Sequence, residues 1–549
     1  MSLRALAALL AAAIQLPAQS GAAAKPLPPD RAKGAGTVDE AQCREWLGVL
    51  ASPEFEGRGT GQEGFQKAAD YVAAHFAALK LEARGDGGTY FQRVPWKATK
   101  VVADKTSVTF TKDGTEVVRI PAANLAGTVS NTMSAAGDVV LLVVTPPPKA
   151  PRTEGRRGFE VPTIAGLEAV DATDKIVVVF VLEGDDSSAT TPMVRLAVQQ
   201  GLQGKSAAAV LFAQTDAVQG GLRGRSGMGR GGNPAAAGAR RAPVDATFGG
   251  NDLKMVLAAA GKSAAQLDGK TLAIPLPLAA KVEIATDEGD APAMNVFAVL
   301  PGSDPKLKDE YVVIGSHLDH LGKRGDRIHP GADDDGSGTT GVMAVAKMFA
   351  TNPTPPKRSI LFVCFCGEEV GLVGSGYFAK NCPVPLSSIV GELQMDMIGR
   401  DEEESAEGNK GEKAEDNRNS VHLVGTQKIS PALHELCLAK NAAAGFDIEY
   451  DEERMFGRSD HANFARMGVP IAFFFTGLHR DYHQPSDTPD KIHYAKLLRV
   501  ARWVYDIAFD LATNPDRPHV DPAAWAKYRD KATEQPAAPL APKAAGSGG

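Results

Sequence analysis

The chain has 549 residues, which is long enough for two or three domains, and its apolar fraction of 43% permits full hydrophobic cores. Its formal net charge of -7 argues against a general nucleic-acid-binding protein, because such proteins usually carry an excess of basic residues. Of the five cysteines, Cys364 and Cys366 alternate along one apolar run, where they would point the same way and bridge each other poorly. Composition therefore predicts a globular protein without a disulfide framework.

The first residues have the pattern of a secretory signal peptide. Arg4 precedes an apolar run over residues 5–16, and small residues follow over 18–24. This run is shorter than the ~20 residues that a membrane-spanning helix needs, and no other stretch is long and apolar enough. We therefore predict export to the periplasm or the extracellular space, without a stable membrane span.

The segment after the leader predicts mixed structure. Apolar residues recur at helical spacing from Phe65 to Leu79, and alternating residues over 90–120 indicate an antiparallel ribbon. The glycine-rich turn at residues 56–61 lacks the Lys-Ser/Thr ending of a phosphate-binding loop, so we interpret it as a tight turn before the helix.

Short β-branched runs at residues 137–145, 174–181 and 207–212 occur without any cluster of ligand-type side chains. They predict a separate, small β-rich module. Residues 219–241 are rich in Gly, Ala and Arg, which is typical either of a nucleic-acid-binding segment or of a solvated loop. In an exported acidic protein we favour the loop, and we expect no nucleic-acid partner.

Polar side chains follow several apolar runs in the second half of the chain. The run that begins at Tyr311 ends in His317, for example, and the run 359–366 leads directly into two glutamates. Because α/β sheets bind ligands beyond the carboxyl ends of their strands, we expect these side chains to meet. They are His317, Asp319, Asp334, Glu368, Glu369, Asp396 and His483.

Two imidazoles and three carboxylates suit zinc, with cobalt or manganese as substitutes. The predicted metal ligands are His317, Asp334, Glu369, Asp396 and His483. Five ligands exceed what one tetrahedral zinc usually takes, so we predict two zinc ions that share one bridging carboxylate.

The adjacent residues Glu368 and Glu369 are predicted to have two different roles. Adjacent residues that leave a strand point in different directions, so one carboxylate can hold a metal while the other contacts the bound water. A metal lowers the pKa of that water from 15.7 to roughly 7 and so generates hydroxide near neutral pH. The free carboxylate then serves as general base, while Asp319, two residues after His317, fits a carboxylate that orients the ligating imidazole.

The mixed-charge run at residues 400–420 is interpreted as an exposed loop rather than a site, and the Pro/Ala-rich tail is expected to be disordered beyond about residue 528. The predicted division is a signal peptide at 1–24, a linker at 25–36, a first part of the main domain at 37–130, an insert at 131–285, a second part of the main domain with the metal site at 286–515, and a tail at 516–549.

Six motifs occur together in one order. They are HLDHLG from His317, GADDDGSG from Gly331, GEEVGLVGS from Gly367, QMDMIG from Gln394, RSDHANF from Arg458 and FFFTGLHRDYHQPSDT from Phe473. In this order they resemble the co-catalytic zinc aminopeptidase family, which includes secreted bacterial leucyl aminopeptidases, glutamate carboxypeptidase II and the transferrin receptor. The resemblance covers residues 38–130 and 286–512, and the insert is similar to a protease-associated domain.

This resemblance implies an α/β fold with a mixed, mostly parallel central sheet flanked by helices, and a β-rich inserted domain. It implies hydrolysis of N-terminal residues from peptides with a free amino terminus. His317 and Asp396 would hold one zinc, Glu369 and His483 the other, and Asp334 would bridge them.

By the same resemblance Glu368 would be the general acid and base, and Asp319 the residue that orients the imidazole. Ser459, Asp460 and His461 fall where the family has a wall of the site. The insert is compatible with a cap on the cleft, a limit on substrate length, or a homodimer contact.

Alternative functions stay open at this point. Zinc carboxypeptidases, deacylases and dipeptidases use similar pairs of carboxylates, and a glutaminyl cyclase has a similar fold. A receptor-like binding protein that has lost its metals is an alternative of another class, against which the intact ligand set argues.

Overall fold

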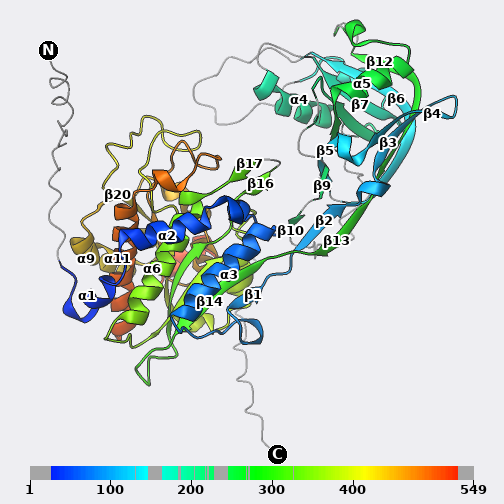
Figure 1. The fold of residues 1–549 in the computed structure, drawn as a ribbon. Coiled ribbons are helices and arrows are strands. Elements are labelled where there is room, and N and C mark those ends of the chain that lie inside the picture. The colour runs from blue at the N-terminus through cyan, green and yellow to red at the C-terminus, as the bar shows by residue number, and fades with distance from the viewer. Residues whose placement is uncertain are drawn as a thin grey trace, which may run out of the picture.

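The computed structural model describes residues 26–529 except 130, 146–162, 183–186, 203, 217, 219–221, 225, 228–244, 268, 270–271 and 325–326. These residues form two lobes joined by a narrow ribbon of strands (Figure 1). The predicted signal peptide, most of the Gly/Arg-rich segment and the end of the tail lie outside the described residues.

The larger lobe is built on an eight-stranded sheet. Its strands, in spatial order, are β1 (Phe91–Arg93), β14 (Met294–Leu300), β18 (Ser359–Phe365), β15 (Tyr311–His317), β19 (Ile389–Met395), β22 (Ile471–Phe475), β20 (Ser420–Val424) and β21 (Asp447–Glu449). β18, β15, β19 and β22 run parallel, whereas β1, β14 and β20 pair with antiparallel neighbours. This confirms the predicted mixed, mostly parallel central sheet.

Helices cover both faces of this sheet. One face packs against α1 (Pro29–Ala35), α2 (Glu40–Leu50), α3 (Glu63–Ala78), α6 (Gly338–Thr351), α9 (Pro431–Ala444) and α11 (Tyr494–Thr513). The other face packs against α7 (Val373–Lys380), α8 (Thr426–Ile429), α10 (His461–Arg466) and α12 (Pro522–Tyr528). Because both faces are covered, every residue of the central strands β15, β18 and β19 is buried, including the polar Glu392 and Gln394 of β19.

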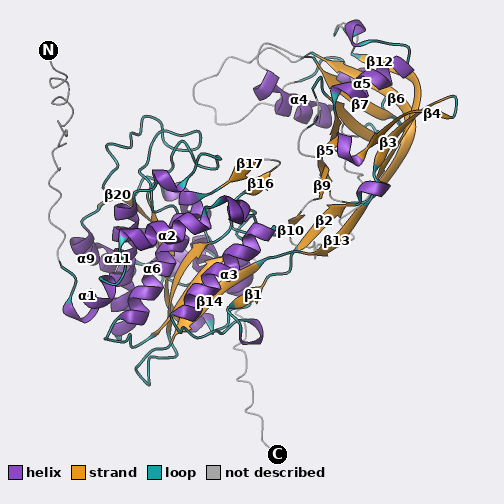
Figure 2. Cartoon of the chain, viewed as in Figure 1, coloured by secondary structure: helices purple, strands orange, loops and turns teal. Residues whose placement is uncertain are grey.

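The second lobe is a nine-stranded sheet with helices on it (Figure 2). Its strands, in spatial order, are β4 (Thr115–Pro121), β3 (Ser107–Lys112), β12 (Ala273–Ile284), β6 (Met133–Val144), β7 (Ile176–Val181), β8 (Ala209–Ala213), β11 (Asp245–Phe248), β5 (Leu125–Val129) and β9 (Leu222–Gly224). The helices are α4 (Ser187–Gly201) and α5 (Gly250–Ala259). Separate apolar clusters lie on the two faces of this sheet, so the lobe has its own core.

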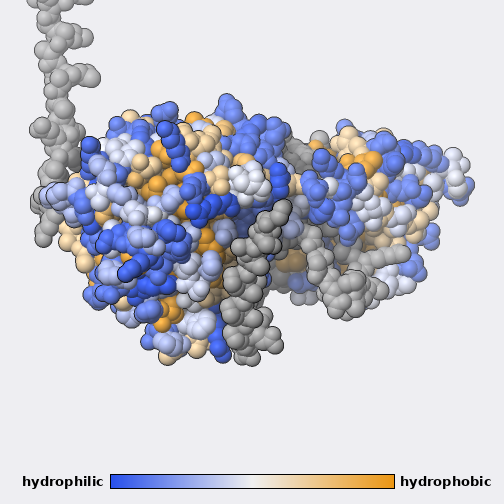
Figure 3. All heavy atoms as spheres, turned by 90° about the horizontal axis from the view of Figure 1, so that it is seen from below, coloured by the Kyte–Doolittle hydropathy of each residue, from blue (hydrophilic) through white to orange (hydrophobic). Residues whose placement is uncertain are grey.

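The chain crosses between the lobes along β2 (Lys97–Val101) and β13 (Thr286–Asp290), which pair antiparallel with each other, and β10 (Ser226–Gly227) adds a third short strand. A hairpin of β16 (Gly322–Arg324) and β17 (Arg327–His329) extends from the larger lobe toward the second one in Figure 1. Figure 3 shows the two lobes from below, with hydrophilic and apolar residues interspersed on that face. No helix among the described residues has both the length and the apolar content needed to cross a bilayer.

Several predicted boundaries differ from the structure. Residues 107–129 fall in the predicted first part of the main domain, yet β3, β4 and β5 belong to the second sheet. The prediction differs because alternating apolar residues indicate a strand but not the strand with which it pairs. The predicted linker contains α1, which the buried ion pair between Arg31 and Asp506 (2.6 Å) holds against α11. The predicted tail contains α12, where Trp525 Nε1 donates to the carbonyl of Arg466.

The run 400–420 is also different from the prediction, because its first part is buried. Asp401, Glu402 and Glu403 have exposed fractions of only 3%, 1% and 7%. Each carboxylate has a cationic or imidazole partner from a distant segment: Lys496 contacts Asp401, His422 contacts Glu402, and Arg480 contacts Glu403. None of these three partners lies within the run itself, and for this reason its sequence alone predicted a solvated loop.

Candidate metal centre

Strand geometry brings the predicted site residues to one edge of the larger sheet. β15 ends at His317, β19 ends one residue before Asp396, and β18 ends three residues before Glu368. These three strands are parallel neighbours, so their carboxyl ends meet. His483 arrives from the segment that follows β22. All five predicted metal ligands are thereby gathered in one place.

His317 is the centre of a first group of donors. Its Nε2 lies 3.2 Å from Oδ1 of Asp334, 3.5 Å from Oδ2 of Asp396 and 3.9 Å from Oε2 of Glu368. Its Nδ1 lies 2.9 Å from the main-chain oxygen of Asp319, which directs Nε2 toward the carboxylates. Burial lowers the pKa of His317, but Asp396 and Glu368 outweigh it and raise that pKa well above its ordinary value.

Asp334 and Glu369 form a second group with two imidazoles. Nε2 of His483 lies 3.2 Å from Oδ2 of Asp334 and 3.2 Å from Oε2 of Glu369. Nδ1 of His320 lies 2.6 Å from Oε1 of Glu369 and 3.6 Å from Oδ2 of Asp334. The sequence analysis did not predict His320 as part of the site. The signal was its place in the HLDH motif, three residues after His317. Asp334 thus offers one oxygen to each group, and both groups have a spacing that could hold a metal ion.

The loop that carries Asp334 is fixed by its neighbours in the chain and by Asp487. The carboxylate of Asp487 accepts the main-chain N–H groups of Asp333 and Asp334 over 3.0–3.2 Å. Asp335 accepts N–H groups of His317 and Met397, both over 3.1 Å. The Asp334–Asp335 peptide bond is cis. The hydrogen bonds of Asp335 and Asp487 connect the loop to the ends of β15 and β19 and to Asp487, and so set the direction of the Asp334 carboxylate.

Gly331 opens this loop with a positive φ of 58°. A Cβ atom there would lie 2.2 Å from the main-chain oxygen of Asp334 and 2.4 Å from the ring of His320. A glycine is therefore required both by the left-handed backbone and by the close approach of the site.

The guanidinium of Arg58 holds the same region by hydrogen bonds to its main-chain oxygens. It donates to the main-chain oxygens of Leu50, Leu318, Pro330 and Gly331 over 2.7–2.9 Å and is fully buried. Arg58 lies in the glycine-rich turn that sequence analysis identified, so that turn supports the metal centre rather than binding phosphate.

The two adjacent glutamates have opposite proton affinities. Burial raises the pKa of Glu368 well above its usual range, and the charges of Glu369 and Asp396 raise it further. Burial and Asp334 also raise the pKa of Glu369, but His320 and His483 outweigh them and hold it at about 2. A pair of carboxyls pushed apart in this way is typical of one group that carries protons and one that stays ionised.

Comparison with known proteins places this part of the chain. Residues 295–508 match peptidase family M28. The matched residues, which are under half of the chain, are called the M28 domain below. The predicted family is thereby confirmed, and the matched residues include every member of both donor groups.

The chain is 30% identical over 227 residues to a probable leucine aminopeptidase of Arthroderma otae, covering 40% of this chain and 57% of the relative. It is 30% identical over 188 residues to leupeptin-inactivating enzyme 1 of Streptomyces exfoliatus, covering 34% and 36%. The matches thus span less than two thirds of these relatives. Among solved structures, an aminopeptidase from Aneurinibacillus sp. strain AM-1 is 20% identical, covers 90% of this chain and 98% of its own, and has a TM-score of 0.48.

Ser459, Asp460 and His461 lie buried beside the centre of the M28 domain. The hydroxyl of Ser459 accepts a hydrogen bond from Nε2 of Gln394 (3.3 Å), and His461 stacks on Phe473 with ring centroids 4.5 Å apart. Burial raises the pKa of Asp460 to about 7. His461 is therefore a packing residue at the start of α10, whereas Asp460 adds another carboxyl next to the donor groups.

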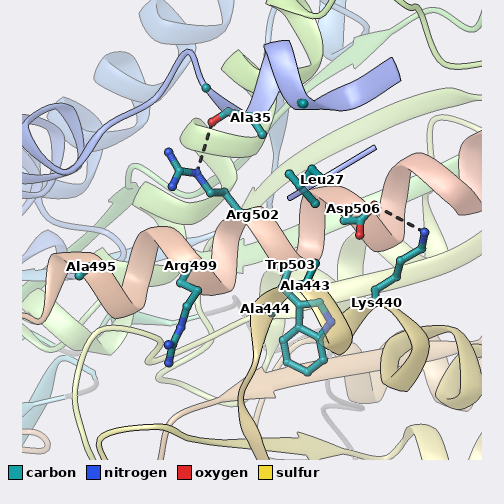
Figure 4. A pocket seen from close by; sticks show the side chains of 12 residues that line it. Leu27, Ala35, Lys440, Ala443, Ala444, Ala495, Arg499, Arg502, Trp503 and Asp506 are labelled. Carbon is teal, nitrogen blue, oxygen red and sulfur yellow. Dashed lines mark hydrogen bonds and ion pairs between the residues drawn. The ribbon is translucent and has the colours of Figure 1, made fainter. Parts of the chain in front are cut away.

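A pocket of about 430 Å³ occurs elsewhere on the larger lobe (Figure 4). It lies between α1, α9 and α11, and its lining includes Trp503, Arg499 and Lys440. None of the metal-centre residues lines it, so it is not part of this site.

Proposed function

We propose that this protein is an exported, zinc-dependent aminopeptidase that removes N-terminal residues from peptides. The observation that carries the proposal is the position of Asp334, which offers one carboxylate oxygen to His317 and the other to His483, beside Glu368. This arrangement lies within an M28 domain, and the related sequences named above include aminopeptidases.

The donor set fits a pair of zinc ions. In the proposed assignment His317 and Asp396 hold one ion, Glu369 and His483 hold the other, and Asp334 bridges the two. Imidazole nitrogens and carboxylate oxygens are ordinary zinc ligands. Oδ2 of Asp334 and Oε1 of Glu369 are buried without a hydrogen-bond partner among the described residues, as atoms reserved for a metal would be. When bound, such ions lower the pKa of a water molecule and stabilise negative charge on a carbonyl oxygen.

Glu368 is assigned as the general base and acid. It lies three residues after the end of β18, and its raised pKa matches a group that takes a proton from the attacking water and returns it to the leaving amine. Asp319 is assigned as a positioning residue. Its main-chain oxygen faces Nδ1 of His317, and its carboxylate accepts the N–H of Glu368, so it orients both neighbours.

The second lobe is proposed to be a protease-associated-like insert that narrows access to the centre, and thereby favours short peptides. Support comes from its separate core and from the β16–β17 hairpin, which extends toward it from the loop between His320 and Gly331 (Figure 1). The export proposal rests on the signal-like residues 1–24, and a homodimer through this lobe is a further proposal.

Hydrolysis of amino-acid p-nitroanilides with free and N-acetylated amino groups tests the proposal, with zinc counted in the same samples. We expect the free-amine substrates to be cleaved, the acetylated ones to be stable, and about two zinc ions to be bound. Glu368→Ala should keep the zinc and lose about 10²–10⁴ in rate. Glu435→Ala, an exposed glutamate on α9, is the matched control and should behave as wild type.

Other outcomes would move the function. If zinc is bound but no free-amine substrate is cleaved, a carboxypeptidase, deacylase or dipeptidase replaces the aminopeptidase. If neither zinc nor hydrolysis is found, the protein is a binding protein of the same fold.

A further inference from the structure

A separate imidazole–carboxylate cluster lies at the far edge of the larger sheet, outside the peptidase centre. His422 belongs to β20, Glu449 ends β21, and Glu402 comes from the buried start of the run 400–420. β20 and β21 are parallel neighbours in which His422 is the partner of Glu449. Three segments far apart in the chain therefore place their polar side chains together.

The distances within this cluster match those around a metal ion. Nε2 of His422 lies 2.9 Å from Oε2 of Glu402 and 3.7 Å from Oε2 of Glu449. Two donors bonded to one tetrahedral zinc at about 2.0–2.1 Å lie roughly 3.3 Å apart. A single ring nitrogen carries at most one hydrogen, so it cannot serve two carboxylates equally well by hydrogen bonding alone. The same pattern surrounds His317 in the peptidase centre.

The charge around His422 is strongly negative. Oδ1 of Asp451 lies 3.2 Å from Nδ1 of His422, yet this nitrogen is buried and has no hydrogen bond to any residue that the structure describes. The remaining contacts are neutral, since Ser420 Oγ donates to Glu449 (2.7 Å) and Asn409 Nδ2 lies 3.4 Å from Glu402. In the described part of the chain no Lys or Arg forms an ion pair with these three carboxylates. A protonated His422 would bring one positive charge beside these three carboxylates, of which Glu402 is buried, Glu449 is 34% exposed and Asp451 is 58% exposed.

We propose that Glu402, His422 and Glu449 bind a third divalent metal ion of the zinc type. One nitrogen and two carboxylate oxygens suit zinc or manganese better than calcium or magnesium, which prefer oxygen ligands. His422 and Glu402 are buried, whereas the Glu449 side chain is 34% exposed, so the ion enters from the solvent side of β21. This site shares no residue with the proposed peptidase centre.

The ion would fasten the run 400–420 to the sheet edge. Glu402 packs against Gly477, where a Cβ would come within 2.3 Å of it, and the N–H of Glu403 donates to the carbonyl of Leu478 (3.0 Å). The segment that starts there carries His483 of the peptidase centre six residues after Gly477. The third ion would thus stabilise the backbone that positions His483, a proposed ligand of the peptidase centre.

The test is a metal count on the full chain. Wild type and Glu449→Gln are saturated with zinc chloride, dialysed, and analysed by mass spectrometry of the metal. We expect Glu449→Gln to hold one equivalent less than wild type. Asp447→Asn, an exposed carboxylate on the same strand, is the matched control and should hold as much as wild type. Glu449 is partly exposed, so its variant should fold, and His422→Gln should show the same loss if it also folds.

The outcome separates the two proposals. The count depends on a difference between variants, so it remains informative if the peptidase centre holds fewer ions than proposed. In a His317→Ala background, which weakens the peptidase centre, the difference of one equivalent should persist. Equal zinc contents in wild type, Glu449→Gln and His422→Gln would overturn the third site and leave His422 as an imidazolium paired with Glu402.

Discussion

The main-chain N–H of Glu368 donates a hydrogen bond to Oδ1 of Asp319 over 3.1 Å. Asp319 also offers its main-chain oxygen to Nδ1 of His317, so one residue touches both the proposed base and a proposed zinc ligand. Burial raises the pKa of Asp319 to about 6, and the charge of His317 opposes this rise. The relationship explains why an aspartate follows His317 by two residues.

Asp319→Asn should lower activity without unfolding the protein. The amide keeps the size of the side chain and an oxygen that can accept the N–H of Glu368, but it lacks the charge that faces His317. Residues that orient metal ligands typically contribute about 10–100-fold to activity or metal affinity. We expect kcat on a p-nitroanilide to fall by about that factor. Asp309→Asn, at an exposed aspartate, should have no effect, and equal activities of the two variants would contradict the assigned role.

Arg58→Lys should destabilise the larger lobe. A lysine ammonium cannot reach the four carbonyls that the guanidinium holds, and hydrogen bonds to charged groups contribute about 1.5–3 kcal/mol each. We expect urea unfolding to show a loss of about 3 kcal/mol or more. Arg93→Lys on β1, where the side chain is exposed, should change stability by less than about 0.5 kcal/mol.

Glu392→Gln should stabilise the protein at neutral pH. Glu392 is fully buried on β19, and in the described part of the chain both of its oxygens lack hydrogen-bond partners. Burial, followed by the charge of Asp460, raises its pKa well above 4.5. The folded state therefore binds this proton more tightly than the unfolded state, so wild-type stability falls as pH rises from about 4.5 through the folded pKa.

The neutral amide removes this loss, so the gain of Glu392→Gln should grow with pH and reach about 1–3 kcal/mol. Urea unfolding at pH 4.5 and pH 8 measures it. Glu45→Gln on the exposed side of α2 should give the same small effect at both pH values. A stability difference for Glu392→Gln that does not change with pH would contradict the prediction.

The central sheet was predictable because its strands are buried on both faces. Residues 311–314 of β15 and 360–365 of β18 are uninterrupted apolar runs, a pattern typical of strands that helices cover on both sides. The membership of β3–β5 in the second sheet was not predictable, since alternating residues at 107–121 fit any half-buried antiparallel strand. Pairing partners such as β12 lie more than 150 residues away, and local pattern carries no information about them.

The peptidase centre was predictable because parallel strands deliver their ends to one edge. His320 was missed because the prediction accepted a complete set of ligands without it. The cluster around His422 was missed for another reason. Its carboxylates come from a run whose composition is typical of a solvated loop, and only the folded structure shows that Glu402 is buried against β20.

His483→Ala should remove one zinc equivalent and almost all activity. Nε2 of His483 is 3.2 Å from both Asp334 and Glu369, a symmetrical position for a ligand, whereas Nδ1 of His320 is 2.6 Å from Glu369 and 3.6 Å from Asp334. The shorter contact makes His320 a neighbour that orients the Glu369 carboxylate, so His320→Gln should keep its zinc and lose about 10–100-fold in activity. Zinc analysis and p-nitroanilide kinetics distinguish the two roles, with exposed His519→Ala as control. Removal of a true ligand leaves the metal with an open coordination position and so weakens its binding. If His483→Ala kept its zinc and His320→Gln lost it, His320 would be the ligand and His483 the residue that orients Glu369.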